Sequence, residues 1–168
     1  MSVCVINADT PALADAMRGL LTRYAREQSW AHEQHHIDEV AGLPGEYGPP
    51  LGRMLLALGE NGEPVGCVLL RPIPQWCDDC LEMRRLYVVP EARRRGVGRA
   101  LIDAAESAAR DSGLATLRFV TLPEMASAHR LYESAGFVHT GPYRPSTAET
   151  PIYMEKRLGP QGASALPG

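Results

Sequence analysis

The pattern of apolar and polar positions divides the chain into two parts. Short apolar runs predict strands at residues 3–6, 53–58, 65–70, 81–89, 117–121, 137–140 and 152–156. Apolar side chains three or four residues apart predict a helix at residues 11–26, a shorter one at 31–40, and two more that begin near Val97 and Met125. Adjacent strands followed by alternating strands and helices indicate an α/β (α+β) fold built on a mixed sheet.

Turn and cap residues mark several of these boundaries. Thr10-Pro11 is typical of a helix start, with the Thr10 side chain as the cap and proline in the first turn. Glu60-Asn61-Gly62 predicts a hairpin turn between two strands, because Asn and Gly tolerate positive φ. Thr121 and Glu124 have the spacing of a capping box, which predicts a helix start directly after the strand at 117–121.

Length and charge narrow the class of protein. The chain has 168 residues, and we expect a single domain over residues 1–158 and a disordered Gly-, Pro- and Ala-rich tail over residues 159–168. The formal net charge of −3 argues against a nucleic-acid-binding protein. The chain has no apolar run long enough for a membrane span, and its first residues lack the pattern of a signal peptide. We therefore expect a cytoplasmic protein that binds neither nucleic acid nor membrane.

Arginines are concentrated in one segment of this acidic chain. Sixteen of the 17 basic residues are arginine, and six of them lie between Arg84 and Arg99. Within that stretch, Arg93-Arg94-Arg95-Gly96-Val97-Gly98-Arg99 follows a predicted strand and opens a predicted helix. Unpaired backbone N–H groups and the helix dipole favour an anion at such a point, and glycine lets the backbone approach it closely. The segment predicts a phosphate or pyrophosphate site.

Two common nucleotide-binding motifs do not fit this segment. A P-loop requires Lys and then Ser or Thr after its second glycine, and no Lys follows here. The Rossmann fingerprint requires a third Gly or Ala where this chain has Leu101. Gly-x-Gly alone is weak evidence for a phosphate site. The alternative, judged from composition, is an ordinary helix start whose arginines are solvated.

The wider sequence around this segment resembles a known family. Glu82 to Pro90, followed by Arg93-x-x-Gly96-x-Gly98-Arg99, closely resembles the acetyl-CoA-binding motif of the GNAT superfamily of N-acetyltransferases. Ala128-x-x-Leu131-Tyr132-x-x-x-Gly136-Phe137 resembles the second motif of that superfamily, in the expected order. The resemblance covers about residues 40–158 and is to a bacterial branch of small GNAT proteins whose substrates are mostly unassigned.

The resemblance implies a fold and a place for the cofactor. The sheet would be twisted, mostly antiparallel, flanked by helices and splayed between its fourth and fifth strands. Coenzyme A would lie in that split, with its pantetheine arm on the backbone of the fourth strand and its pyrophosphate on the glycine-containing loop. No metal is expected. The residues expected to bind acetyl-CoA are Leu86, Tyr87, Val88, Arg93, Arg94, Arg95, Gly96, Val97, Gly98 and Arg99.

Acetyl transfer from a thioester to an amine requires a neutral amine, a stabilised oxyanion and a protonated leaving thiolate. The resemblance places Tyr132 on the helix that faces the thioester sulfur, so Tyr132 is the expected acid. Its alternative role is that of a packed aromatic ring. Glu82 near the start of the fourth strand is the expected base, and its alternative is an ion pair with Arg84 or Arg85.

The sequence therefore predicts an acetyl-CoA-dependent N-acetyltransferase that moves an acetyl group to a primary amine by direct attack. The acceptor would be a small-molecule amine or a peptide N-terminus, and a homodimer is left open. A non-catalytic acyl-CoA-binding sensor of the same fold is the main alternative, because a sensor would need neither Tyr132 nor Glu82. A nucleotide-binding enzyme is a third interpretation, which the missing Lys and third Gly oppose.

Three other features have less specific patterns. The Cys77-x-x-Cys80 pair has no second pair for a structural zinc site, and it is expected to lie in a turn between strands. The histidines His32, His35 and His36 are expected on a solvated helix face, with a substrate entrance as the alternative. The loop Tyr143-Arg144-Pro145 is expected to help shape the acceptor pocket.

Overall fold

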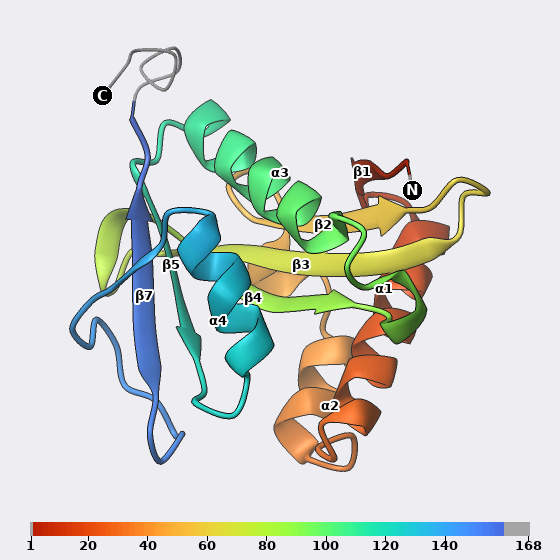
Figure 1. The fold of residues 1–168 in the computed structure, drawn as a ribbon, viewed down its shortest axis with the longest axis horizontal. Helices are drawn as coiled ribbons and strands as arrows, with labels where there is room; N and C mark the ends of the chain where they lie inside the picture. Colours follow the sequence, from red (N-terminus) through yellow and green to blue (C-terminus); the bar gives the residue numbers. More distant parts are fainter. Residues whose placement is uncertain (1, 160–168) are drawn as a thin grey trace.

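A seven-stranded sheet in the order β1-β2-β3-β4-β5-β7-β6 forms the centre of the molecule (Figure 1). The computed structural model describes residues 2–159, so nearly all of the expected tail lies outside the described residues. Neighbouring strands are antiparallel except β4 and β5, which are parallel. This confirms the predicted mixed, mostly antiparallel sheet. The strands are β1 (Cys4–Asn7), β2 (Arg53–Leu58), β3 (Pro64–Ile73), β4 (Cys77–Val88), β5 (Thr116–Thr121), β6 (Val138–His139) and β7 (Ile152–Arg157).

Four α-helices and two short 3-10 turns accompany the sheet within residues 2–159. They are α1 (Pro11–Glu27), α2 (Gln34–Ala41), η1 (Gly45–Tyr47), η2 (Pro90–Ala92), α3 (Val97–Asp111) and α4 (Ala126–Ser134). The predicted cap of α1 is confirmed, since the Leu13 amide donates to Thr10 Oγ1 at 3.2 Å. Within the described residues, no helix combines the length and the apolar character needed to cross a membrane.

Helices α1 and α3 cover opposite faces of the sheet. A Cβ built on Gly66 of β3 would lie 3.0 Å from Leu101 and 3.1 Å from Val97, both on α3. The next residue, Cys67, points the other way, and its partner across the sheet, Tyr87, stacks on Tyr24 of α1 with ring centroids 4.8 Å apart. The core lies between these helices and the sheet. Its largest fully buried side chains include Met17, Leu21, Leu56, Leu69, Leu70, Leu81, Leu101, Ile102 and Leu117.

The sheet is split between β4 and β5. These strands pair only over Cys80–Glu82 and Thr116–Arg118, at the beginning of each strand. Beyond Glu82 they diverge, and Figure 1 shows β4 and β5 running in different directions from their common start. The predicted splay between the fourth and fifth strands is confirmed.

The predicted capping box after β5 is wrong. Thr121 pairs with Ile152 as the last residue of β5, and α4 begins only at Ala126. The residue before α4 is Met125, and no side chain caps the helix. Thr121 is held in the sheet by its pairing with β7, so its hydroxyl is too far back along the chain to reach the first amides of α4.

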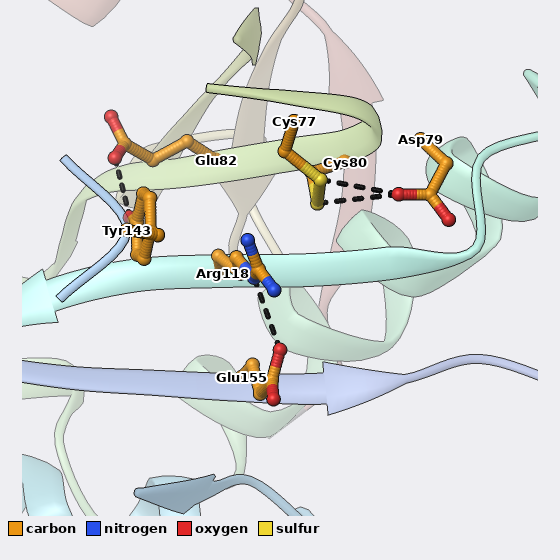
Figure 2. The surroundings of a disulfide bond; sticks show 7 residues. All are labelled: Cys77, Asp79, Cys80, Glu82, Arg118, Tyr143 and Glu155. Carbon is orange, nitrogen blue, oxygen red and sulfur yellow. Dashed lines mark hydrogen bonds and ion pairs between the residues drawn. A yellow bond between two sulfur atoms is a disulfide. The ribbon is translucent and has the colours of Figure 1, made fainter. Parts of the chain in front are cut away.

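The Cys77-x-x-Cys80 segment is not the turn that connects β3 to β4. The turn lies at residues 74–76, and β4 already begins at Cys77. The register changes from Pro72 opposite Leu81 to Ile73 opposite Cys77, so β4 has extra residues at this point. A disulfide joins Cys77 and Cys80 across this bulge, and Figure 2 shows Asp79 beside the two sulfur atoms. Both sulfur atoms are in the disulfide and offer no thiolate.

Candidate functional site

The split between β4 and β5 opens into a cleft of about 530 Å³. Five separate segments line it. They are the end of α1 with the following loop and the first turn of α2 (within 24–35), β4 (83–86), β5 with the following loop (119–125), Tyr132 of α4, and the loop at 144–148. The cleft therefore depends on the fold to assemble it, because no two of these segments are adjacent in the sequence.

A bulge in β4 shapes the inner wall of the cleft. The pairing with β3 changes from Leu69–Arg84 to Cys67–Tyr87, and Arg85 has a φ of 59°. Among the described residues, no strand pairs with the β5-facing edge of β4 beyond Glu82. The backbone groups of that edge are available to an extended ligand. Leu86, expected to contact pantetheine, lines the cleft, whereas the Tyr87 side chain is buried on the α1 side.

Tyr132 reaches the cleft from α4 and is 7% exposed. Its ring packs on Phe119 with centroids 4.2 Å apart, and Phe137 lies edge-on at 6.2 Å. Its hydroxyl makes no hydrogen bond to any described residue. Burial raises the pKa of Tyr132, so the phenol keeps its proton at neutral pH. The structure therefore has both features at once, the packed ring and a free phenolic proton.

Glu82 is fully buried, and its two carboxylate oxygens are surrounded by donors. Arg71 donates Nε at 2.9 Å and places Nη2 at 2.7 Å from Oε1. Tyr143 Oη and Arg144 Nε each donate to Oε2 at 2.5 Å, and Figure 2 shows the Tyr143 bond. The alternative prediction, that Glu82 forms an ion pair, is confirmed, but the predicted partners are wrong, since Glu82 pairs with Arg71 and Arg144. Arg84 and Arg85 instead bond to Glu39.

This network sets the charge state of Glu82. Burial alone would raise the pKa of Glu82, but hydrogen bonds from Tyr143 and Arg144 and the charges of Arg71 and Arg144 outweigh it and hold the pKa below its ordinary value. A carboxylate has about four lone-pair positions, and all are engaged here. Glu82 could accept a proton from an amine only if one of these bonds opened.

The segment 93–99 forms a backbone cradle at the start of α3. Arg94 has a φ of 63° and Gly96 a φ of 81°. Within the described chain, the amides of residues 94–99 donate to no backbone carbonyl, and the first bond into α3 runs from Ala100 to Gly96. A Cβ on Gly96 would meet no atom within 4 Å. Such a run of free amides at a helix N-terminus binds anions.

The side chains of the cradle differ in their availability. Arg93 is engaged, donating to the Val88 carbonyl at 2.9 Å and to Glu27 at 2.5 Å, and Arg99 pairs with Asp103 at 3.1 Å. Arg94 and Arg95 are exposed and in no ion pair with a described residue. Val97 is buried in the core and offers only its backbone. The two free guanidiniums and the amides are thus the groups that an anion would meet.

Sequence reasoning missed the aromatic wall of the cleft. Tyr24 and Trp30 line it, with ring centroids 5.2 Å apart. The expected solvated face is wrong for His36, which is 3% exposed and packs edge-on against Trp30 at 5.4 Å. His35 does line the cleft, and so do Arg144 and Pro145 of the loop at 143–145, whereas Tyr143 does not. A tryptophan in an otherwise polar segment was the one signal in the sequence for this wall.

Comparison with known proteins gives a consistent result. The profile of the "Acetyltransferase (GNAT) family" matches residues 15–137. An uncharacterized N-acetyltransferase of Schizosaccharomyces pombe is 38% identical over 125 residues, covering 74% of this chain and 76% of the relative. A GNAT-family acetyltransferase of Staphylococcus aureus superposes with a TM-score of 0.77 at 13% identity, over 94% of this chain and all of that one.

A solved aminoglycoside 6′-N-acetyltransferase in complex with coenzyme A has a TM-score of 0.69 at 21% identity, over 95% of this chain and 98% of its own. The fold of the present chain is thus one that holds coenzyme A in a solved protein. The family profile spans most of the chain, including the cradle, the bulged strand and Tyr132. With sequence and fold in agreement, the protein is an N-acetyltransferase of the GNAT family.

Proposed function

We propose that this protein transfers the acetyl group of acetyl-CoA to a primary amine by direct attack in the β4/β5 cleft. The observation that carries the proposal is the β4 edge that no described strand pairs beyond Glu82, with Tyr132 in the cleft beside it and the free amides of residues 94–99 in the segment that follows β4. The family and the coenzyme A complex of a fold relative support the choice of cosubstrate.

The cradle and β4 would divide the binding of acetyl-CoA between them. Backbone amides of residues 94–99, with Arg94 and Arg95, would hold the pyrophosphate. Backbone groups of Leu86, Tyr87 and Val88 would bond to the pantetheine arm as an added strand would. This arrangement would bring the thioester into the cleft, beside Tyr132.

The chain's residues then supply the chemistry of transfer. The amine nitrogen forms a bond to the thioester carbonyl carbon, and a backbone N–H near Val88 stabilises the developing oxyanion. As the carbon–sulfur bond breaks, Tyr132 donates its phenolic proton to the departing thiolate and regains a proton from water before the next turnover. The amine loses its proton to water in the cleft, or to Glu82 if one of the four contacts to that carboxylate opens.

Thiol release measured with acetyl-CoA and a panel of amines tests the proposed function. We expect release that depends on the amine, and binding of acetyl-CoA but not of NAD or ATP by calorimetry. Acetyl-CoA binding without release for any amine would favour a non-catalytic acyl-CoA sensor. Comparable affinity for NAD would contradict the assignment of the cradle.

Gly98→Val tests the start of α3. A Cβ on Gly98 would lie 2.8 Å from Leu131 Cδ2 on α4, so the added methyl groups would push α4 away from the cradle. We expect the Kd for acetyl-CoA to rise more than tenfold while the protein stays folded, as measured by calorimetry and thermal unfolding. Gly19→Val on α1, where an added Cβ meets nothing within 4 Å, is the matched control.

A second substitution shows whether Gly98→Val weakens acetyl-CoA binding by displacing α4 or by blocking the pyrophosphate. If the introduced valine side chain acts through Leu131, combining Gly98→Val with Leu131→Ala makes room and restores affinity. If affinity stays low, the branched side chain obstructs the pyrophosphate directly. An unchanged Kd in folded Gly98→Val would mean that the cofactor binds elsewhere.

A further inference from the structure

Three arginines, Arg84, Arg85 and Arg144, line the cleft into which the proposed function brings the acceptor. The only acidic residue among the described residues that line it is Glu33. We infer that the acceptor is a small amine that carries a carboxylate close to its amino group, and that Arg85 binds this carboxylate. The inference rests on the proposed function and names the substrate class of the same site.

Arg85 is held in place from several sides. Its Nε donates to Glu39 Oε1 at 2.9 Å, and its guanidinium carbon lies 4.8 Å from the centre of the Trp30 ring. Trp30 is itself fixed between Tyr24 and His36. The left-handed backbone at Arg85 is part of the β4 bulge, and three consecutive residues there, Arg84, Arg85 and Leu86, line the cleft. This rigid support removes much of the entropy cost of binding through a long side chain.

The terminal nitrogens of Arg85 are the part left for a ligand. Neither Nη1 nor Nη2 makes a hydrogen bond within the described residues, whereas Nε is engaged by Glu39. Two parallel N–H groups on a planar fork match the two oxygens of a carboxylate. Arg85 and Tyr132 line the same cleft, so a carboxylate on Arg85 and an amine that attacks a thioester beside Tyr132 would belong to one small molecule.

The charges that balance these arginines lie outside the cleft wall. Glu39 bridges Arg84 and Arg85, and Glu82 pairs with Arg144, but neither carboxylate lines the cleft. A polyamine or an aminoglycoside would therefore bring several positive charges against guanidinium groups. The cleft of about 530 Å³ must also hold the thioester end of the cosubstrate, which favours a small acceptor such as an amino acid.

Matched acceptors test the inference without any variant. We would compare free amino acids with their carboxamides, which lack the carboxylate, at matched concentrations of the neutral amine because the amide also has a lower amine pKa, and add spermidine and kanamycin as polycations. Thiol release at saturating acetyl-CoA should give a kcat/KM about 10- to 100-fold higher for an acid than for its amide, the range expected for charge-assisted bonds. Polycations should react more slowly than either.

Arg85→Gln then tests whether Arg85 is the residue responsible for the preference for carboxylate-bearing acceptors. KM for the acid should rise about 10- to 100-fold with kcat nearly unchanged, while kcat/KM for the amide should change little. Arg85→Lys should recover part of the loss, because it keeps the charge without the planar fork. Arg157→Gln, which makes the same substitution at an exposed arginine of β7 outside the cleft, is the control and should leave both values unchanged.

The outcomes separate the two proposals. Equal values for acid and amide, or faster acetylation of the polycations, would overturn the carboxylate inference and leave the acetyltransferase activity standing. An equal loss for acid and amide in Arg85→Gln would show that Arg85 only supports the fold of the cleft. No thiol release with any amine would contradict the proposed function itself.

Discussion

Replacing Tyr132 by Phe should lower kcat by about 100-fold or more, the usual loss when a general acid is removed. The substitution deletes only the phenolic hydroxyl, which has no protein partner among the described residues, and keeps the ring that packs on Phe119 and Phe137. Affinity for acetyl-CoA should hardly change, because a proton donated to the thiolate matters in the transition state and not in the ground state. Steady-state kinetics with separate calorimetry measures both quantities.

The controls for Tyr132→Phe separate chemistry from packing. Its thermal midpoint should stay close to that of the parent protein, since no hydrogen bond to the protein is lost. A turnover near the parent value would show that Tyr132 is only part of the aromatic cluster and that the thiolate is protonated by another group. A loss of acetyl-CoA affinity of the same size as the loss of kcat would instead indicate a role in binding.

Glu82→Gln should destabilise the folded protein by about 3–5 kcal/mol at neutral pH, the usual cost of breaking a buried ion pair from one side. The Gln amide would turn N–H groups toward Arg71, Arg144 or Tyr143 and leave buried positive charge without its partner. Chemical denaturation with a linear extrapolation measures the difference. Glu91→Gln, which breaks an exposed pair with Arg23, is the control and should change stability little.

The Glu82 effect should depend on pH with a definite sign. The folded-state pKa is lowered, so the carboxylate contributes stability that is present above the unfolded-state value of about 4.3 and is lost as pH falls through the folded-state value. The gap between the parent protein and Glu82→Gln should be largest near pH 6 to 8 and narrow below about pH 4. A gap that is constant over this range would mean that Glu82 does not titrate with folding.

Local patterns predicted the elements well but not the partners of individual side chains. Strand β2 occupies Arg53–Leu58 as its apolar run predicts, and Thr10 caps α1. The partners of Glu82 lie 11, 61 and 62 residues away, so they are set by topology and not by neighbouring sequence. Alternation along β4 likewise gives no sign of the bulge at Arg85, which results from pairing with β3.

The sequence predicted the part of the candidate site that is built from backbone groups, but not the part that depends on side chains from distant segments. The glycine-containing cradle follows directly from residues 93–99, and the free amides are a consequence of the helix start. The aromatic wall of Tyr24 and Trp30 exists only because α1 and the following loop fold against β4. A sequence alone does not place such distant segments together.

The left-handed turn at Arg94 and Gly96 has a consequence for how such a protein can change over generations. On the proposed assignment, the cosubstrate is bound largely through peptide groups, which every amino acid carries, so many substitutions outside the glycines, Arg94 and Arg95 leave these contacts in place. The acceptor is bound through side chains, and a single nucleotide change can replace one of the arginines that bind it. A lineage can therefore explore new acceptors by point mutation while its acetyl donor stays the same.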